Sequence, residues 1–491
     1  MGVYSLSQPL TVPNAIAALA IAPPPSPHEP PSMMAGLPFV GLLLCIAILP
    51  LVPRLSHWWH CNRNKLMVSA VWGLITLIYY LFRGTGFGHG DDAAAAGLHS
   101  VFKVLNHAVL KEYTPFMVLL FSLYTICGNI TLHGHLKATP STNSLFLATG
   151  AVLASFVGTT GASMLLIRPL LQTNKDRQHV KHTVIFFIFL VSNIGGCLLP
   201  IGDPPLFLGY LKGVPFLWTL SLWKPWLFCC VVLLIVYYLW DRHLYHKEPS
   251  YHKEPMYRKE LPLGHMLDET RIEPLQLAGS LNFVWLLGVV LTVALVVPGK
   301  PLLGSSVMVP IFLREAIMLG MVGAAWISSS AHVRKSNEFN FGAIIEVAVL
   351  FLGIFITMQA PVEILKIQGP RLPLTSPEQF FWATGGLSSF LDNAPTYVVF
   401  FTTAESLTHA AGPGILQLLG GEFIRVDLLV AISLGAVFMG ANTYIGNGPN
   451  FMVKSIAEQA GVRMPSFFGY MLYSVGILVP LFVAVTFIFL R

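Results

Sequence analysis

Ten runs of apolar residues, each about 16–24 residues long, constrain this chain more than any other feature of its sequence. An α-helix rises 1.5 Å per residue, so about 20 apolar residues cross the hydrocarbon core of a bilayer. Only 11% of the residues are charged, against about 25% in an average soluble protein. We therefore predict an all-α polytopic membrane protein with about ten transmembrane helices. The runs cover residues 36–53, 66–83, 115–132, 183–200, 219–240, 279–298, 307–329, 341–360, 427–442 and 467–490.

The composition and several missing motifs exclude other classes of protein. A chain that is 54% hydrophobic is not typical of a soluble enzyme, a disordered chain or a nucleic-acid binder. No segment reads G-x-x-x-x-G-K, H-E-x-x-H or G-x-S-x-G, which are signatures of ATPases, metalloproteases and serine hydrolases. We expect no enzymatic activity, no bound cofactor and no nucleic-acid partner, and the lipid bilayer as the surrounding medium.

Two further apolar stretches, 144–171 and 379–401, are interrupted midway by small and polar residues. The first is interrupted at Gly158–Gly161 and the second at Leu391–Thr396. Each arm on either side of the interruption is too short to cross a bilayer. We predict that both stretches form re-entrant hairpins.

The chain contains an internal repeat around these interruptions. A short Ala-Thr-Gly segment precedes each hairpin tip, and a second motif with the pattern Ile-Gly-(Asp/Asn) follows it in both halves. The ten predicted crossings divide equally between the two halves. Because five crossings is an odd number, the second half starts on the opposite side of the membrane from the first, and the two halves are predicted to have opposite topology. The matching segments are Ala148–Gly150 with Ala383–Gly385, Ser155–Thr160 with Ser389–Ala394, and Ile201–Phe207 with Ile445–Phe451.

The predicted organisation has four parts. A proline-rich N-terminal tail is followed by the first repeat, a charged linker with a short tandem repeat, and the second repeat. Each repeat is expected to contain one hairpin and one broken helix, about 183–212 in the first and about 427–455 in the second. The boundaries are 1–35 for the tail, 36–240 for repeat 1, 241–275 for the cytoplasmic linker and 276–491 for repeat 2.

Lysine and arginine positions predict the orientation. With the N-terminus outside and ten crossings, the inside loops carry the excess of basic residues, as the positive-inside rule requires. The first hairpin then enters from the cytoplasm and the second from outside. We expect a multi-pass protein of the plasma (inner) membrane. The stretch 94–110 has valines and leucines on one face and is interpreted as an amphipathic helix on the membrane surface.

Inverted halves with broken helices are the architecture of secondary transporters. Irregular backbone at mid-bilayer is tolerated where it lines a cavity enclosed by protein. Ionisable residues at that depth are functional candidates, and Asp203 in the first break and Asp392 at the second hairpin tip are the strongest. The neutral candidates around them are Thr159, Thr160, Asn193, Asn393, Asn442, Thr443 and Asn447.

These residue types suit a transported cation. Sodium prefers oxygen ligands, which carboxylates, hydroxyls and amide carbonyls supply. Burial and a neighbouring carboxylate both favour protonation of an aspartate, so Asp203 and Asp392 are candidates for proton coupling. Two other interpretations stay open: both aspartates could be helix N-caps, and Asn193, Asn442 and Thr443 could satisfy backbone groups left free at the breaks.

The motifs resemble those of the ion transporter superfamily. Two segments in the first break and one at the second hairpin tip are similar to NhaD-type sodium/proton antiporters. Longer strings around both breaks resemble a bacterial, CitMHS-like family of citrate transporters or sodium:proton antiporters. The segments are Ser192–Gly196, Pro200–Asp203 and Leu391–Pro395, then Ile201–Phe216 and Gly440–Phe451.

The resemblance covers about residues 36–490. It implies an alternating-access carrier, often elevator-like and commonly a homodimer. Dicarboxylate carriers of this superfamily repeat Ser-Asn-Thr at both hairpin tips, whereas these tips read Gly-Thr-Thr and Asp-Asn-Ala, which disfavours a dicarboxylate substrate.

Three functions follow as expectations. The first is exchange of sodium or lithium for protons, favoured because the core motifs contain no lysine or arginine. The alternative is transport of citrate or a related carboxylate coupled to Na⁺ or H⁺. The third is an anion permease or channel of the arsenite type.

Overall fold

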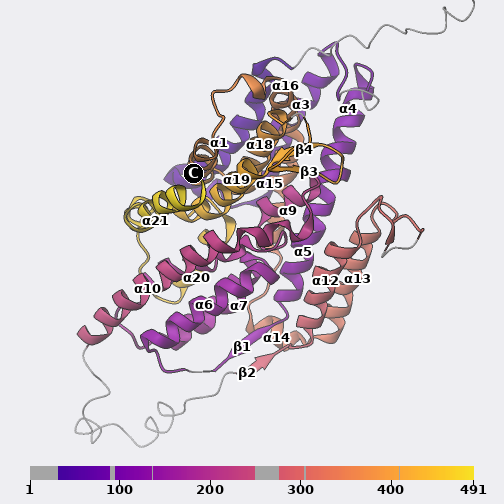
Figure 1. Cartoon of the computed structure of the whole chain (residues 1–491). Helices are drawn as coiled ribbons and strands as arrows, with labels where there is room; N and C mark the ends of the chain where they lie inside the picture. The colour runs from indigo at the N-terminus through magenta and orange to yellow at the C-terminus, as the bar shows by residue number, and fades with distance from the viewer. Residues whose placement is uncertain (1–30, 89–93, 135, 249–275, 303–305, 409) are drawn as a thin grey trace, which may run out of the picture.

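The computed structural model describes residues 31–88, 94–134, 136–248, 276–302, 306–408 and 410–491. The proline-rich tail up to residue 30 and most of the predicted linker lie outside the described residues. The described chain is helical apart from two small antiparallel sheets (Figure 1). Strand β1 (Thr131–His133) pairs with β2 (Gln276–Ala278), and β3 (Ile415–Gln417) pairs with β4 (Phe423–Arg425).

Long apolar helices confirm the all-α, multi-pass class. Four helices of the described residues are long and apolar enough to cross a membrane, or five if one bent pair counts as a single span. They are α3 (Asn62–Phe82), the helix Leu98–Cys127, the helix Phe216–Lys247 that contains α10 (Trp223–Lys247), and α21 (Phe467–Phe489). The bent pair is α15 (Gly342–Thr357) with α16 (Gln359–Gln368), which meet at 40°.

Several predicted spans are shorter helices. These are α1 (Leu37–Ile48), α8 (Lys181–Leu190), α12 (Asn282–Leu295), α13 (Leu313–Ser328) and α19 (Val426–Met439). The short helices α2 (Pro53–Trp59) and α14 (Ala331–Ser336) lie in connections.

The stretch 94–110 is not a separate surface helix, so that interpretation is wrong. It runs through α4 (Leu98–Leu105) and a π-helical turn (Asn106–Tyr113) directly into α5 (Thr114–Cys127). The result is one helix of 30 residues. The apolar face of 98–105 therefore continues a spanning helix, because no capping residue ends the helix before α5.

The order of elements is the same in both halves. In the first half, a hairpin of two helices is followed by α8, a break, a short helix and α10. In the second half, a hairpin is followed by α19, a break, a short helix and α21. The hairpins are α6 (Pro140–Val157) with α7 (Thr159–Thr173) and α17 (Pro377–Ser388) with α18 (Asn393–Ser406); the short helices are α9 (Pro204–Leu211) and α20 (Gly448–Gln459).

Capping residues start the first arm of each hairpin, and a glycine makes the turn of the first hairpin. Thr139 caps α6 by accepting a hydrogen bond from the Thr142 amide, so the first arm starts four residues before the expected 144. Ser376 and Gln379 form a capping box that starts α17. Gly158, with φ of +80°, makes the sharp turn between α6 and α7 that other residues rarely adopt.

The two broken helices form the centre of the molecule. Every residue of α8 from His182 to Leu190 is buried, and α19 is buried along nearly its whole length. A helix that is apolar on all sides must be surrounded by other helices. The breaks that follow α8 and α19 are therefore enclosed by protein.

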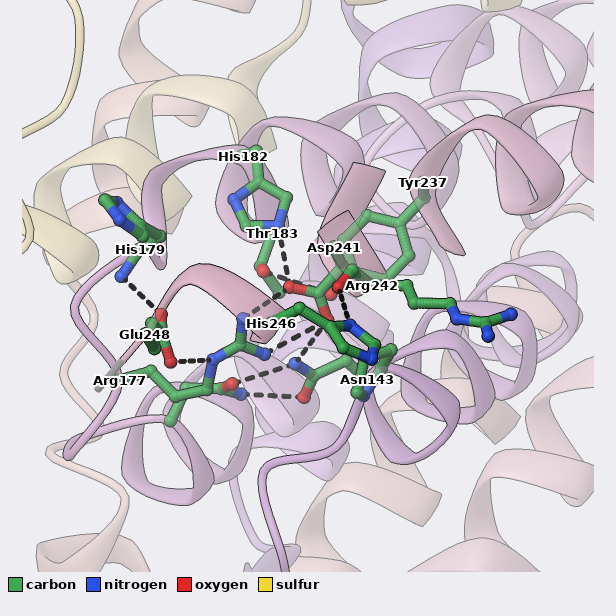
Figure 2. Close-up of polar contacts among 12 residues, drawn as sticks. Asn143, Arg177, His179, His182, Thr183, Tyr237, Asp241, Arg242, His246 and Glu248 are labelled. Carbon is green, nitrogen blue, oxygen red and sulfur yellow. Dashed lines mark hydrogen bonds and ion pairs between the residues drawn. The ribbon is translucent and has the colours of Figure 1, made fainter. Parts of the chain in front are cut away.

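A buried ion pair lies at the end of the first hairpin that is opposite to its tip (Figure 2). Asp241 of α10 is fully buried and accepts hydrogen bonds from the Arg177 guanidinium at 2.8 and 3.1 Å. His182 Nε2 lies 2.9 Å from the same carboxylate, and Arg177 Nε also donates to Glu248 at 3.1 Å. This cluster joins the α7–α8 connection to α8 and α10.

Candidate functional site

The carboxylate of Asp203 is the centre of a buried polar cluster. Asp203 is 1% exposed at the start of α9. Its Oδ1 accepts hydrogen bonds from Thr159 Oγ1 at 3.0 Å and from Asn447 Nδ2 at 3.1 Å. Its Oδ2 accepts one from Asn393 Nδ2 at 2.8 Å. The four residues come from the two hairpins and the two breaks, so each half supplies two of them.

The internal repeat explains this convergence. In the matched segments, Thr159 of the first hairpin tip corresponds to Asn393 of the second, and Asp203 of the first break corresponds to Asn447 of the second. Equivalent positions of the two halves therefore meet at one point. The repeat places a single carboxylate among three neutral donors.

An equivalent serine holds each break against its hairpin. Ser155 Oγ donates to the carbonyl of Gly195 at 2.5 Å. Ser389 Oγ lies 2.8 Å from the Gly385 carbonyl of its own helix and 3.1 Å from the Met439 carbonyl, and it accepts a bond from Asn442 Nδ2 at 2.9 Å. Backbone carbonyls freed by the breaks are thus satisfied by side chains, as a buried backbone requires.

Asparagines also connect the two breaks to each other. Asn193 Nδ2 donates to the Ile188 carbonyl at 2.8 Å and to Asn450 Oδ1 at 2.7 Å. Asn450 Nδ2 donates to the carbonyls of Gly440 and Thr443 at 2.8 and 2.9 Å. Asn447 Nδ2 lies 3.3 Å from Asn193 Oδ1, so this chain of amides reaches the Asp203 cluster.

The predicted site residues divide into two groups. Thr159, Asp203, Asn393 and Asn447 are in direct contact, and Asn193 adjoins them through Asn447. The others lie around the hairpin tips: Thr443 Oγ1 and Asn442 Nδ2 bond Ser389, Thr160 is half-buried in the first turn of α7, and Asp392 is half-buried at the start of α18.

The two aspartates have different local roles. Asp392 Oδ1 accepts a hydrogen bond from the Ala394 amide at 3.0 Å and therefore caps α18. Asp203 occupies the N-cap position of α9 without a side-chain capping bond, because its oxygens are directed to Thr159, Asn393 and Asn447. The helix-cap interpretation is correct for Asp392 and wrong for Asp203.

Sequence reasoning missed three residues of the network, which are Asn450, Ser155 and Ser389. Asn450 stands in the second break where the first has the apolar Leu206, and this departure from the repeat was a usable signal. Ser155 and Ser389 occupy the same position in both matched segments. A polar residue retained in both halves of a repeat, next to a break, indicates a backbone partner.

Glycines allow the first break to approach the hairpin tip closely. A Cβ added to Gly196 would lie 2.6 Å from Thr159 Cγ2 and 2.8 Å from the Gly202 carbonyl oxygen. Both distances are shorter than a van der Waals contact, and Gly202 O is backbone.

We expect Gly196→Ala to lower the free energy of unfolding by about 1–3 kcal/mol, because overpacking displaces the break. Thermal unfolding of the purified protein in detergent measures this loss. Gly448→Ala is the matched control in the second break, since its added Cβ meets nothing within 4 Å. Equal midpoints for the two variants would contradict the close approach described above.

The electrostatics of the cluster combine one negative charge with positive helix ends. No lysine or arginine among the described residues forms an ion pair with Asp203. Helices α7, α9, α18 and α20 all begin at the cluster, because Thr159, Asn393 and the positions after Asp203 and Asn447 are their first residues. Each N-terminus carries roughly half a positive charge.

Two amide oxygens at the site have no donor. Asn393 Oδ1 and Asn442 Oδ1 are buried and accept no hydrogen bond within the described part of the chain. Buried acceptors are normally satisfied. Together with the Asp203 carboxylate they are oxygen ligands of the kind that a hard cation prefers.

Apolar spanning helices, two interrupted hairpins and an enclosed polar centre define a multi-pass membrane transporter with broken helices. The chain belongs to the CitMHS_2 family, described as putative citrate transport, whose model matches residues 29–490. This confirms the resemblance to the citrate-transporter family, and it identifies a transport protein rather than an enzyme family. No curated protein matches the chain.

Proposed function

We propose that this protein is a secondary active carrier that moves citrate or a related carboxylate together with Na⁺ or H⁺ by alternating access. The family description supports the carboxylate substrate. The observation that carries the proposal is the meeting of four helix N-termini at one carboxylate that has no basic partner among the described residues.

The coupling ion follows from the charge of Asp203. A buried carboxylate without a countercharge is costly, and the cost is largest inside a membrane. A proton on Asp203 removes the charge, and a sodium ion beside it balances the charge. Asn393 Oδ1 is buried and accepts no hydrogen bond within the described part of the chain, so it is a further oxygen available to sodium.

In this proposal, helix N-termini and neutral hydrogen-bond donors surround the substrate anion. Helix N-termini attract carboxylates through the positive end of the helix dipole, although α9 itself begins with Pro204 and Pro205, which have no backbone N–H. The amide of Asn393 adds a side-chain donor, because Nδ2 carries a second hydrogen beyond the one that it donates to Asp203. The negative charges that these groups leave uncompensated are balanced by the cotransported cation, which makes uptake of the anion depend on the cation.

Both hairpins contribute to the same carboxylate, and this supports alternating access. A movement of either hairpin away from the breaks removes one donor from Asp203 and opens the site on that side. With the substrate and cation bound, the contacts of both hairpins are restored. The site is then occluded and can open to the opposite side of the plasma membrane.

Exchange of Na⁺ or Li⁺ for H⁺ is the second candidate. The same unpaired carboxylate favours it, because a proton and a sodium ion would compete for Asp203. Antiport requires no carboxylate substrate, so a single assay separates the two candidates.

Uptake of labelled citrate by proteoliposomes tests the proposal. We expect accumulation of citrate when an inward Na⁺ or H⁺ gradient is imposed, and none without a gradient, at a clamped membrane potential. A dye for internal pH is present in the same vesicles. A pH response to Na⁺ or Li⁺ without citrate, together with no citrate uptake under either gradient, would replace the proposal by cation/proton antiport.

A further inference from the structure

A basic cavity lies beside three helices that lead to the Asp203 cluster, at the ends of these helices that are farther from the cluster. Its volume is about 1000 Å³. One wall is the α7–α8 connection, and the other is the connection between α20 and α21. Trp240 of α10 forms part of the interior, stacked between His182 and Tyr473 at ring-centroid distances of 6.0 Å each.

The charges around this cavity are predominantly positive. Its lining contains five lysines and arginines and one acid, Glu338. Arg168 is paired with Glu338 at 2.7 Å, and Arg177 with both Asp241 at 2.8 Å and Glu248 at 3.1 Å (Figure 2). The remaining three, Lys175, Lys181 and Arg463, are exposed and form no ion pair among the described residues.

The three unpaired cations come from both halves of the chain. Lys175 and Lys181 lie in the first half, at the end of the first hairpin and the start of α8. Arg463 lies in the second half, between α20 and α21. Like charges brought together by folding repel each other, and a multiply charged anion between them removes that repulsion.

The cavity and the Asp203 cluster are joined by the same helices. Helix α7 begins at the cluster with Thr159 and ends at the cavity, and α20 does the same from Gly448. Helix α8 begins at the cavity with Lys181 and leads to Asn193. Helices α7 and α20 are in contact and lie side by side in Figure 1. Twelve residues of α20 span about 18 Å, so the cavity lies one short helix away from the cluster.

We propose that this cavity, the basic vestibule, binds a small polycarboxylate anion on its way to or from the Asp203 cluster. The inference rests on the proposed carboxylate transport and adds to it a second binding site, separate from the Asp203 cluster. Ammonium and guanidinium groups bind carboxylates through charge-assisted hydrogen bonds, and arginine binds them in a bidentate manner. A concave site lined by one sign of charge concentrates the opposite ion, by about 10- to 1000-fold in association rate.

The positive-inside rule gives a simpler account of these basic residues. It requires lysines and arginines near the ends of spanning helices, but it does not require them to line one cavity from two connections. The two accounts predict different effects of removing the charge, since only a binding site makes the KM for citrate depend on these side chains.

The test uses the double variant Lys181→Gln/Arg463→Gln in proteoliposomes of neutral lipid. We expect the KM for citrate to rise about tenfold with an unchanged maximal rate. The salt dependence of KM is expected to weaken in parallel, because fewer charges attract the anion. Lys181→Arg/Arg463→Lys keeps the charges and is expected to retain the original KM.

Lys137→Gln is the matched control. Lys137 is exposed in the connection before α6, lies outside the cavity and forms no ion pair among the described residues. It removes one positive charge near the same hairpin. An equal rise of KM in Lys137→Gln and in the double variant would assign the effect to general surface charge and overturn the vestibule.

A binding measurement separates this inference from the proposed function. Labelled citrate is equilibrated with purified protein carrying either Asp203→Asn or Lys181→Gln/Arg463→Gln. We expect salt-sensitive binding to persist in the first variant and to weaken about tenfold in the second. That binding result supports the basic vestibule whether or not citrate uptake is found. If no uptake is found, only the proposed transport is contradicted. Unchanged citrate binding in the double variant would overturn the vestibule alone.

An anionic lipid headgroup is the other ligand that such a cavity could hold. Vesicles with and without phosphatidylglycerol distinguish the two sources. We expect the KM difference between the original protein and the double variant in both kinds of vesicle. A difference that exists only with the anionic lipid would assign the cavity to the headgroup and overturn the proposal.

Discussion

We expect Asp203→Asn to reduce cation-coupled citrate uptake by about 100-fold or more. The substitution keeps the size of the side chain but removes the negative charge that balances the coupling ion. Hydrogen bonds to a charged group contribute about 1.5–3 kcal/mol, and each 1.4 kcal/mol is about tenfold in an equilibrium constant. Asp203 accepts three such bonds, so loss of its charge affects Thr159, Asn393 and Asn447 together. Initial rates of uptake at saturating citrate, with and without a Na⁺ or H⁺ gradient, measure the effect.

Two asparagine variants provide the comparison. Asp392→Asn is expected to lose less than about tenfold, because asparagine caps a helix as well as aspartate does and Asp392 caps α18. Asp176→Asn, on an exposed turn after α7, is expected to leave uptake unchanged. If Asp392→Asn abolished coupling and Asp203→Asn did not, the coupling ion would have to be placed at the second hairpin tip instead.

We expect Arg177→Met to lower the free energy of unfolding by about 3–5 kcal/mol, the usual cost of leaving a buried charge without its partner. Asp241 is fully buried, and Arg177 supplies two of the hydrogen bonds that its carboxylate accepts. His182 Nε2 remains 2.9 Å from the carboxylate, but the guanidinium charge beside it is gone. Thermal unfolding in detergent and the yield of folded protein measure the loss.

The double variant Arg177→Met/Asp241→Leu separates charge from packing. We expect it to be more stable than Arg177→Met alone, because an apolar pair of similar volume leaves no buried charge. Arg168→Met is the surface control: its side chain and that of Glu338 are 29% and 69% exposed, and such a pair contributes about 0–1 kcal/mol. A double variant less stable than the single one would show that the ion pair itself, rather than the avoidance of an unpaired charge, stabilises the first hairpin.

Much of the fold could be predicted because its signals are local. The apolar runs locate the helices, and the interruptions at Gly158 and around Asp392 locate the hairpin turns. The surface helix expected at 94–110 was wrong for a reason that hydropathy does not contain, since a π-helical turn carries the helix on into α5. The number of crossings and the opposite orientation of the halves stay predictions.

The candidate site could be predicted only in part. The nine candidate residues include all four that meet at Asp203, because polar residues next to a helix break are few in such an apolar chain. Their pairing could not be predicted, since Asp203 and Asn393 are 190 positions apart. Asn450 was missed because the position that it matches in the first half is apolar.

The sequence by itself determined that this protein lies in a membrane, where its helices run and where they break. These properties depend on the transfer of apolar side chains from water and on the limits that glycine and proline set for the backbone, which act within a few residues. Only the tertiary structure decided that Asp203 takes the centre of the cluster while Asp392 caps a helix. It alone also brought Lys175, Lys181 and Arg463 around one cavity. Hydrogen bonds and charge interactions join residues by distance in space, and folding brings together positions that the chain keeps far apart.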